Sequence, residues 1–192
     1  MKVIGITGGI GSGKSTIAGM LREAGYPVFD CDFYAKSIYN SDKDVISDMK
    51  KLFGENIYKD GLLDKKALAD IVFKDKISLE KLNSVIHPKV REFMSFQIKE
   101  CKSDLFFVES AILIESGLVK YVDKVLCVTA PEEVRIKRSM DRDNTTREKV
   151  KARMKFQVCD DRRLSKSDYV ISTDQDLDKV KTFLFKLVDN MK

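Results

Sequence analysis

The chain has 192 residues, a formal net charge of +5, 34 % charged residues and 43 % apolar residues, which is typical of one globular domain with a sizeable core. No apolar run approaches the roughly 18–20 residues that a membrane-spanning helix needs, which argues against a membrane protein. The chain enters a strand-like run at residue 2 and its four cysteines form no Cys-x-x-Cys pair, so we expect no signal peptide, no disulfide framework, no zinc site and a cytoplasmic location.

The apolar run at residues 2–7 predicts a first strand, and the glycine-rich stretch after it predicts a phosphate-binding loop. Residues 8–15 fit the pattern Gly-x-x-x-x-Gly-Lys-Ser. Glycines let the backbone curl so that successive N–H groups point at phosphate oxygens, while Lys14 adds charge and the Ser15 hydroxyl suits Mg²⁺. A ligand-free glycine turn is the alternative. The residues expected to bind the nucleotide are Gly11, Ser12, Gly13, Lys14, Ser15 and Thr16.

Helices and further strands are expected to alternate along the rest of the chain. A helix follows the loop until Gly25 stops it. Mostly apolar runs predict strands buried on both faces of a parallel sheet, at residues 27–30, 105–109, 124–129 and 169–172. Further helices are expected at residues 131–141, 146–159 and 177–191. The pattern predicts an α/β fold with a doubly wound, five-stranded parallel sheet and ligands at the carboxyl ends of the strands.

The connection between the second and third strands is too long for a plain crossover. Within it, apolar residues recur at helical spacing, at Leu79, Leu82, Ile86, Val90 and Phe93. We therefore expect a helical insertion at residues 33–103 that covers the site, inside a single domain of residues 1–192.

The segment from Arg135 to Lys166 is strongly basic, with twelve Lys/Arg against five Asp/Glu. Such a segment indicates a nucleic-acid surface, a site for an anionic small molecule or a solvated helix face. The polar break at residues 142–147 is typical of a lid hinge or of an ordinary helix–helix loop. Beside a phosphate loop, we favour a small helical lid at residues 138–158 that clamps a polyphosphate.

Three classes of enzyme share this kind of loop: GTPase switches, large ATPases and small-molecule kinases. No Asn-Lys-x-Asp motif is present to bind guanine, which disfavours a GTPase switch. The chain is short and lacks an obvious acidic motif followed by sensor elements, which disfavours a large ATPase. A kinase also needs a group that accepts the proton of the acceptor hydroxyl. Asp30 and Asp32 end the second strand, where an i, i+2 pair shares one side, so Asp32 either faces the γ-phosphate or caps the next helix.

The chain resembles the dephospho-CoA kinase family over nearly its whole length. The phosphate loop is generic, but the other motifs together are much more particular. They are Asp-Cys-Asp at 30–32, Ile-His-Pro at 86–88, the run at 107–115, Arg138 with Arg142-Asp143, Arg-Met-Lys-Phe-Gln at 153–157 and Ser-Asp-Tyr-Val-Ile at 167–171.

The resemblance implies a P-loop kinase that uses ATP and Mg²⁺ to phosphorylate the ribose 3′-hydroxyl of dephospho-CoA. We expect no nucleic-acid or membrane partner, and a monomer or weak homo-oligomer. A nucleoside or nucleotide kinase of similar architecture is the alternative, and a nucleic-acid-binding or regulatory nucleotide-binding protein is a third.

The resemblance also implies roles for named residues. Asp32 would orient or deprotonate the 3′-hydroxyl, and Lys14, Arg138 and Arg142 would neutralise the transferring group. The acceptor would be bound by Asp32, His87, Arg153 and Gln157, and the metal by Ser15 and Glu109. Two simpler interpretations stay open: His87 is held by a chain break at Pro88, and Arg153 and Gln157 share one solvated helix flank.

Three positions depart from the family pattern. Glu109-Ser110-Ala111-Ile112-Leu113 stands where Asp-x-Pro-Leu-Leu is usual, so the longer carboxylate would reach the metal through water. Thr173-Asp174-Gln175 replaces a frequent Asn-x-Gly, so adenine contacts there are not carried over. Cys31 replaces a common alanine.

Overall fold

The computed structural model describes residues 1–72 and 75–192, and these divide into two compact units. The first unit contains Met1–Asp30 and Ile98–Lys192, and the second contains Cys31–Gln97. The expected insertion at residues 33–103 falls largely on the second unit, and its residues 73 and 74 lie outside the described residues. Its role as an acceptor-binding insertion stays a prediction.

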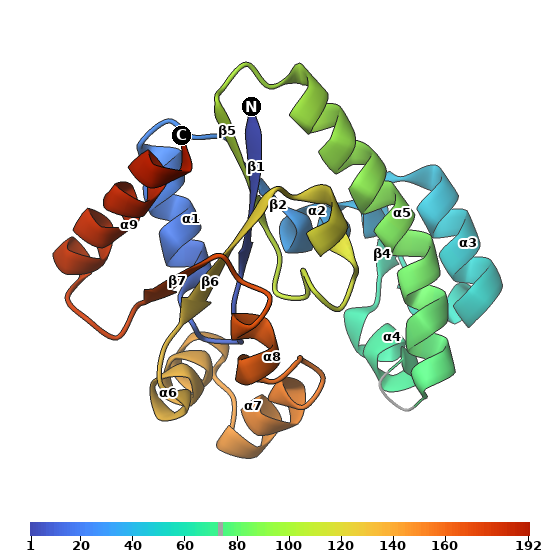
Figure 1. Ribbon diagram of the computed structural model, residues 1–192. Helices are drawn as coiled ribbons and strands as arrows, with labels where there is room; N and C mark the ends of the chain where they lie inside the picture. Colours follow the sequence, from blue (N-terminus) through green and yellow to red (C-terminus); the bar gives the residue numbers. More distant parts are fainter. Residues whose placement is uncertain (73–74) are drawn as a thin grey trace. The chain divides into compact units, whose positions relative to one another are not determined.

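The first unit is built on a five-stranded parallel sheet of order β2-β5-β1-β6-β7 (Figure 1). The strands are β1 (Lys2–Thr7), β2 (Val28–Asp30), β5 (Leu105–Glu109), β6 (Lys124–Thr129) and β7 (Tyr169–Ser172). From β1 the chain goes to β2 at one edge of the sheet and returns to β5, which lies between β2 and β1. It then crosses to β6 and β7 on the other side of β1, so the direction in which strands are added reverses between β1 and β5. Ligands of such sheets bind at the carboxyl ends of the strands beside this reversal. The predicted fold class is confirmed.

The central strands are apolar on both faces because both faces are buried. Ile4, Ile6, Phe107 and Leu126 are fully or almost fully buried in the core of this unit. On one face of the sheet, α1 (Lys14–Glu23) and α9 (Leu177–Met191) lie side by side (Figure 1). Both helices add buried side chains to the same cluster, namely Ile17, Leu21, Val180, Leu184, Val188 and Met191.

Three shorter helices precede β7 in the first unit: α6 (Glu132–Asp143), α7 (Arg147–Met154) and α8 (Asp160–Leu164). The prediction of one helix at residues 146–159 is wrong, because the chain leaves the helix after Met154. The N–H groups of Phe156 and Gln157 donate to carbonyls only three residues back, and the N–H of Val158 donates to the Glu115 carboxylate at 2.8 Å. Contacts with distant residues replace the helical bonds there.

The second unit is mainly helical and also contains a short hairpin. Its elements are α2 (Cys31–Ser41), α3 (Lys43–Phe53), a 3₁₀ turn (Glu55–Ile57), β3 (Tyr58–Lys59), β4 (Leu62–Leu63), α4 (Lys65–Val72) and α5 (Lys76–Glu100). The helix α5 buries Leu82, Ile86 and Val90 at four-residue spacing. The alternative that a break at Pro88 fixes His87 is wrong, because Pro88 lies inside α5 with an exposed ring.

No helix in residues 1–72 or 75–192 combines the length and apolarity that crossing a bilayer requires.

Candidate active site

The phosphate loop lies between β1 and α1, at the carboxyl end of the sheet, and two of its glycines have left-handed backbones. Gly11 has φ 74° and Gly13 has φ 90°. A side chain at Gly11 would also run into the Arg135 carbonyl oxygen. Side chains are rarely compatible with such φ values, so glycine is required at both positions. The result is a backbone turn that ligand atoms can approach closely.

Lys14 and the start of α1 make this turn electropositive. The Lys14 Nζ donates to the carbonyl oxygens of Gly8 at 3.0 Å and Gly9 at 3.2 Å, so the ammonium group spans the loop. At the helix N-cap, Gly13 has no side chain to bond the first-turn N–H groups, and Ser15 and Thr16 are exposed. A helix N-terminus of this kind attracts phosphate groups. The structure therefore gathers the six residues predicted to bind the nucleotide on one loop and one helix start.

Arg138 is held against the loop through Thr173, the first residue after β7. Its Nη1 donates to the Thr173 hydroxyl at 2.7 Å, and its Nη2 donates to the Thr173 carbonyl oxygen at 2.9 Å. The same hydroxyl donates to the Ser12 carbonyl oxygen at 2.8 Å. Thr173 is thus a site residue that the sequence interpretation recorded only as a departure. Its place at the carboxyl end of a predicted strand was the available signal.

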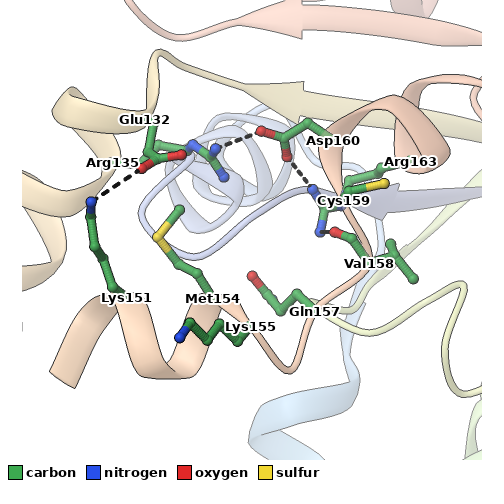
Figure 2. A pocket seen from close by; sticks show the side chains of 10 residues that line it. All are labelled: Glu132, Arg135, Lys151, Met154, Lys155, Gln157, Val158, Cys159, Asp160 and Arg163. Atoms are coloured by element: carbon green, nitrogen blue, oxygen red, sulfur yellow. Dashed lines mark hydrogen bonds and ion pairs between the residues drawn. The ribbon is translucent and has the colours of Figure 1, made fainter. Parts of the chain in front are cut away.

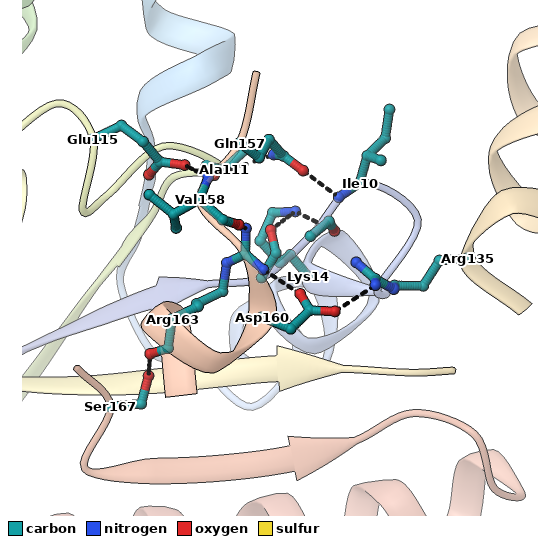
Figure 3. Close-up of polar contacts among 12 residues, drawn as sticks. Ile10, Lys14, Ala111, Glu115, Arg135, Gln157, Val158, Asp160, Arg163 and Ser167 are labelled. Atoms are coloured by element: carbon teal, nitrogen blue, oxygen red, sulfur yellow. Dashed lines mark hydrogen bonds and ion pairs between the residues drawn. The ribbon is translucent and has the colours of Figure 1, made fainter. Parts of the chain in front are cut away.

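Gln157 also contacts the loop directly. Its Oε1 accepts the Ile10 N–H at 2.9 Å, and its Nε2 donates to the Ala111 carbonyl oxygen at 3.3 Å (Figure 3). The idea that Gln157 lies on a solvated helix flank with Arg153 is wrong, because α7 ends before Gln157 and its side chain bonds to two other segments of the first unit.

Arg142 and Arg153 meet at a single carboxylate where α6 turns into α7. Arg142 donates to both oxygens of Asp143, at 2.7 and 3.1 Å, and Arg153 Nη2 lies 2.9 Å from Asp143 Oδ2. Asn144 ends α6 with φ 45°, which gives the chain its reversal. The hydrogen bond from Arg142, reinforced by Arg153, lowers the pKa of Asp143 to about 2. These contacts fasten the two helices of the predicted lid to each other.

Glu109 and Ser15 provide hard oxygen atoms at the same edge of the sheet. Glu109 ends β5, is 6 % exposed and pairs in register with Ile6 of β1 and Asp30 of β2. Arg22 Nη2 lies 3.8 Å from its Oε2. Among the described residues, no set of three His, Cys, Asp or Glu side chains gathers in a way that would hold a metal. Hydroxyl and carboxylate oxygens nevertheless fit Mg²⁺, which is usually held by one or two protein groups together with water and substrate phosphates.

Asp32 and His87 belong to the second unit. The prediction that Asp30 and Asp32 share one side of a strand is wrong, because β2 ends at Asp30 and α2 begins at Cys31. Asp32 lies in the first turn of α2 rather than at the cap before it, and a negative charge there is favourable to the helix dipole. His87 lies half-buried on α5, where burial and, to a lesser extent, Arg91 lower its pKa. Its imidazole is therefore neutral near pH 7.

Replacing Thr173 by Val should weaken ATP binding without unfolding the protein. The change keeps the shape of the side chain but removes the hydroxyl that joins Arg138 to Ser12, so we expect the Kd for ATP to rise about five- to tenfold. Isothermal titration calorimetry measures it. Thr182→Val, which removes a hydroxyl on the surface of α9, is the matched control. Equal affinities of the two variants would contradict this role for Thr173.

The contacts of Asp143 should be lost only in strong acid. The pKa of Asp143 falls from an ordinary 3.8 to about 2 in the folded protein. A lowered pKa means that the stabilisation is complete above the ordinary value and disappears as the pH falls toward the folded one. Carboxyl ¹³C NMR should show this titration, and Arg153→Gln should raise the pKa. Arg147→Gln, whose arginine pairs with Glu133, should leave it unchanged. A wild-type pKa near 3.8 would show that Arg142 and Arg153 do not pair with Asp143 in solution.

Comparisons with known proteins assign the family. The family model described as dephospho-CoA kinase matches residues 2–179. A dephospho-CoA kinase from Fusobacterium nucleatum is 41 % identical over 189 residues, covering 97 % of this chain and 95 % of the relative. One from Listeria monocytogenes is 36 % identical over 198 residues, covering 98 % of both.

Solved structures agree with this assignment. The dephospho-CoA kinase from Campylobacter jejuni has 29 % identity and a TM-score of 0.70, covering 98 % of this chain and 96 % of its own. A shikimate kinase from Acinetobacter baumannii, at 16 % identity and a TM-score of 0.57, covers 100 % of this chain and 93 % of its own and shares the fold. The family match and the dephospho-CoA kinase relatives, together with the phosphate loop at the reversal point of the sheet, show that the chain belongs to the dephospho-CoA kinase family.

Proposed function

We propose that this protein transfers the γ-phosphate of ATP to the ribose 3′-hydroxyl of dephospho-CoA, giving CoA and ADP, the last step of CoA biosynthesis. The observation that carries the proposal is the family match over residues 2–179, on a chain whose loop has the backbone and charge that a triphosphate needs. Phosphoryl transfer depends on positioning and on neutralising charge more than on covalent help from the protein.

Cationic side chains of the first unit would neutralise the negative charge of the phosphoryl group in transfer. Lys14 already lies across the loop, and Arg138 is anchored beside it through Thr173. Both would offset the charge of the transferring group. Arg142 would join them from the lid, where its side chain is 58 % exposed in its pair with Asp143.

The second unit would supply the acceptor side of the reaction. Asp32 follows the end of β2 by two residues and would orient the 3′-hydroxyl and accept its proton. The neutral imidazole of His87 would hydrogen-bond the acceptor. Arg153 and Gln157 would contribute from the lid, where Arg153 pairs with Asp143 and Gln157 bonds to Ile10 of the loop.

Mg²⁺ is proposed as the metal, held by Ser15 directly and by Glu109 through water. Bound there, it would supply charge neutralisation at the β- and γ-phosphate oxygens. The longer Glu109 side chain, in place of the usual Asp, suits such an indirect role.

The same proposal extends to the substrate class, the oligomeric state and the location of the protein. Six of the twelve Lys/Arg side chains of the basic segment are engaged in internal ion pairs, which favours a small anionic substrate over nucleic acid. A reaction contained within one chain needs no second copy, which suits a monomer or weak homo-oligomer. The absence of disulfides among the described cysteines suits a reducing cytoplasm.

An acceptor panel tests the proposed reaction. Purified protein with ATP and Mg²⁺ should release ADP rapidly with dephospho-CoA, and only at background rates with nucleosides, nucleoside monophosphates or shikimate. A coupled ADP assay measures each rate. Faster turnover with a nucleoside or nucleotide would support the alternative kinase, and no turnover with dephospho-CoA would exclude the proposed one. Salt-dependent binding of an oligonucleotide would revive a nucleic-acid role.

Asp32→Asn should lower kcat at least about a hundredfold, because a positioned proton acceptor contributes about 10²- to 10⁴-fold to such reactions. The Kd for ATP should stay within about twofold, since a group acting in the transition state adds little to ground-state binding. Asp70→Asn, at an exposed position on α4 in the same unit, is the control and should change neither quantity. An unchanged kcat in Asp32→Asn would remove this residue from the mechanism.

A further inference from the structure

Two arginines of the first unit are almost completely buried behind the phosphate loop. Arg135 on α6 is 5 % exposed and Arg163 on α8 is 2 % exposed. Both guanidinium groups bond to one carboxylate: Arg135 Nη2 to Asp160 Oδ2 and Arg163 Nη1 to Asp160 Oδ1, each at 2.5 Å (Figure 3). Buried charges are tolerated only when they are paired. Asp160 therefore allows two like charges to lie close together.

Arg135 touches the loop itself. A side chain built at Gly9 would collide with Arg135 Nη1, and one at Gly11 would collide with the Arg135 carbonyl oxygen. The arginine thus fills the space behind both glycines and limits where the loop backbone can move. Its guanidinium is held from the opposite side by Asp160.

Arg163 reaches the loop by a second route. Its Nη2 donates to the Val158 carbonyl oxygen at 2.9 Å, which holds the turn that carries Gln157. Gln157 in turn accepts the Ile10 N–H. The two routes, through Arg135 and through Gln157, meet at adjacent residues of the loop.

The cluster lines a cavity of about 410 Å³. Figure 2 shows Asp160 between the two arginines, with Lys151 and Lys155 on the α7 side of the same cavity. The Asp160 side chain is 47 % exposed, whereas those of its partners are 6 % and 2 % exposed. The Nε atoms of both arginines are also buried, and they have no hydrogen-bond partner in the described residues. The carboxylate is therefore the main counter-charge of both groups.

We propose that Asp160 is a positioning residue for ATP binding, which acts through Arg135 to keep the phosphate loop in its binding conformation. The inference rests on the proposed use of ATP, and not on the identity of the acceptor. Without the carboxylate, two buried guanidinium groups repel each other across a poorly solvated space. Arg135 then withdraws from Gly9, and the loop must be ordered again when the phosphates bind, which weakens affinity.

Asp160→Asn tests the proposal, because it keeps the size of the side chain and removes its charge. Calorimetric titration with Mg-ATP, in the absence of any acceptor, should give a Kd at least about tenfold above that of the wild type. The KM for dephospho-CoA should stay within about twofold. Asp161→Asn is the matched control: it makes the same charge change on the same helix, at an exposed position, and should bind ATP as the wild type does.

A double variant separates positioning from a general loss of stability. If Asp160 acts through Arg135, the two changes are not independent, so Asp160→Asn with Arg135→Gln should lose no more affinity than Arg135→Gln alone. Additive losses would overturn the proposal. So would wild-type affinity in Asp160→Asn, or a loss that matches only its unfolded fraction measured by circular dichroism.

Arg135→Gln alone keeps the proposal testable if Asp160→Asn does not fold. Asp160 then retains its pair with Arg163, but the guanidinium behind Gly9 is gone, and the Kd for ATP should again rise about tenfold or more. Unchanged affinity would overturn the proposal. Normal ATP binding without turnover on dephospho-CoA would instead contradict only the proposed acceptor.

Discussion

A loop that wraps phosphate groups with its backbone needs glycines where side chains would block the ligand, and other parts of the protein must then hold it in place. In this chain the left-handed glycines let the backbone turn, but they have no side chains that could bond to distant segments. The contacts come from Thr173 after β7, Gln157 after α7 and Arg135 on α6. Each joins the loop to a different, sequence-distant element of the first unit.

This requirement gives a structural role to part of the basic segment, which begins in α6 and ends just after α8. Two of its arginines are buried behind the loop, Arg138 is bonded to Thr173, and Arg142 and Arg153 share Asp143. These five arginines are paired with carboxylates or with a carbonyl oxygen. Such pairing pre-organises the groups that meet the substrate.

The sequence predicts the sheet well because strands buried on both faces read as apolar runs, and β5, β6 and β7 begin and end where those runs do. Helix ends were less predictable, since the bonds of Gln157 and Val158 to distant segments override the local helical pattern. The pattern at Pro88 suggested a chain break that is not present, because α5 tolerates the exposed proline ring. The position of Thr173 after a predicted strand was a signal, but the pairing of Asp160 with Arg135 depends on three-dimensional neighbours that no spacing rule reveals.

The central claim is the destination of the phosphate, and ³¹P NMR of the product tests it most directly. With ATP, Mg²⁺ and dephospho-CoA, the account predicts a new phosphomonoester signal on the ribose 3′-oxygen, formed in equal amount with ADP. Recovery of the γ-phosphate only as inorganic phosphate, or on another hydroxyl of the acceptor, would contradict it.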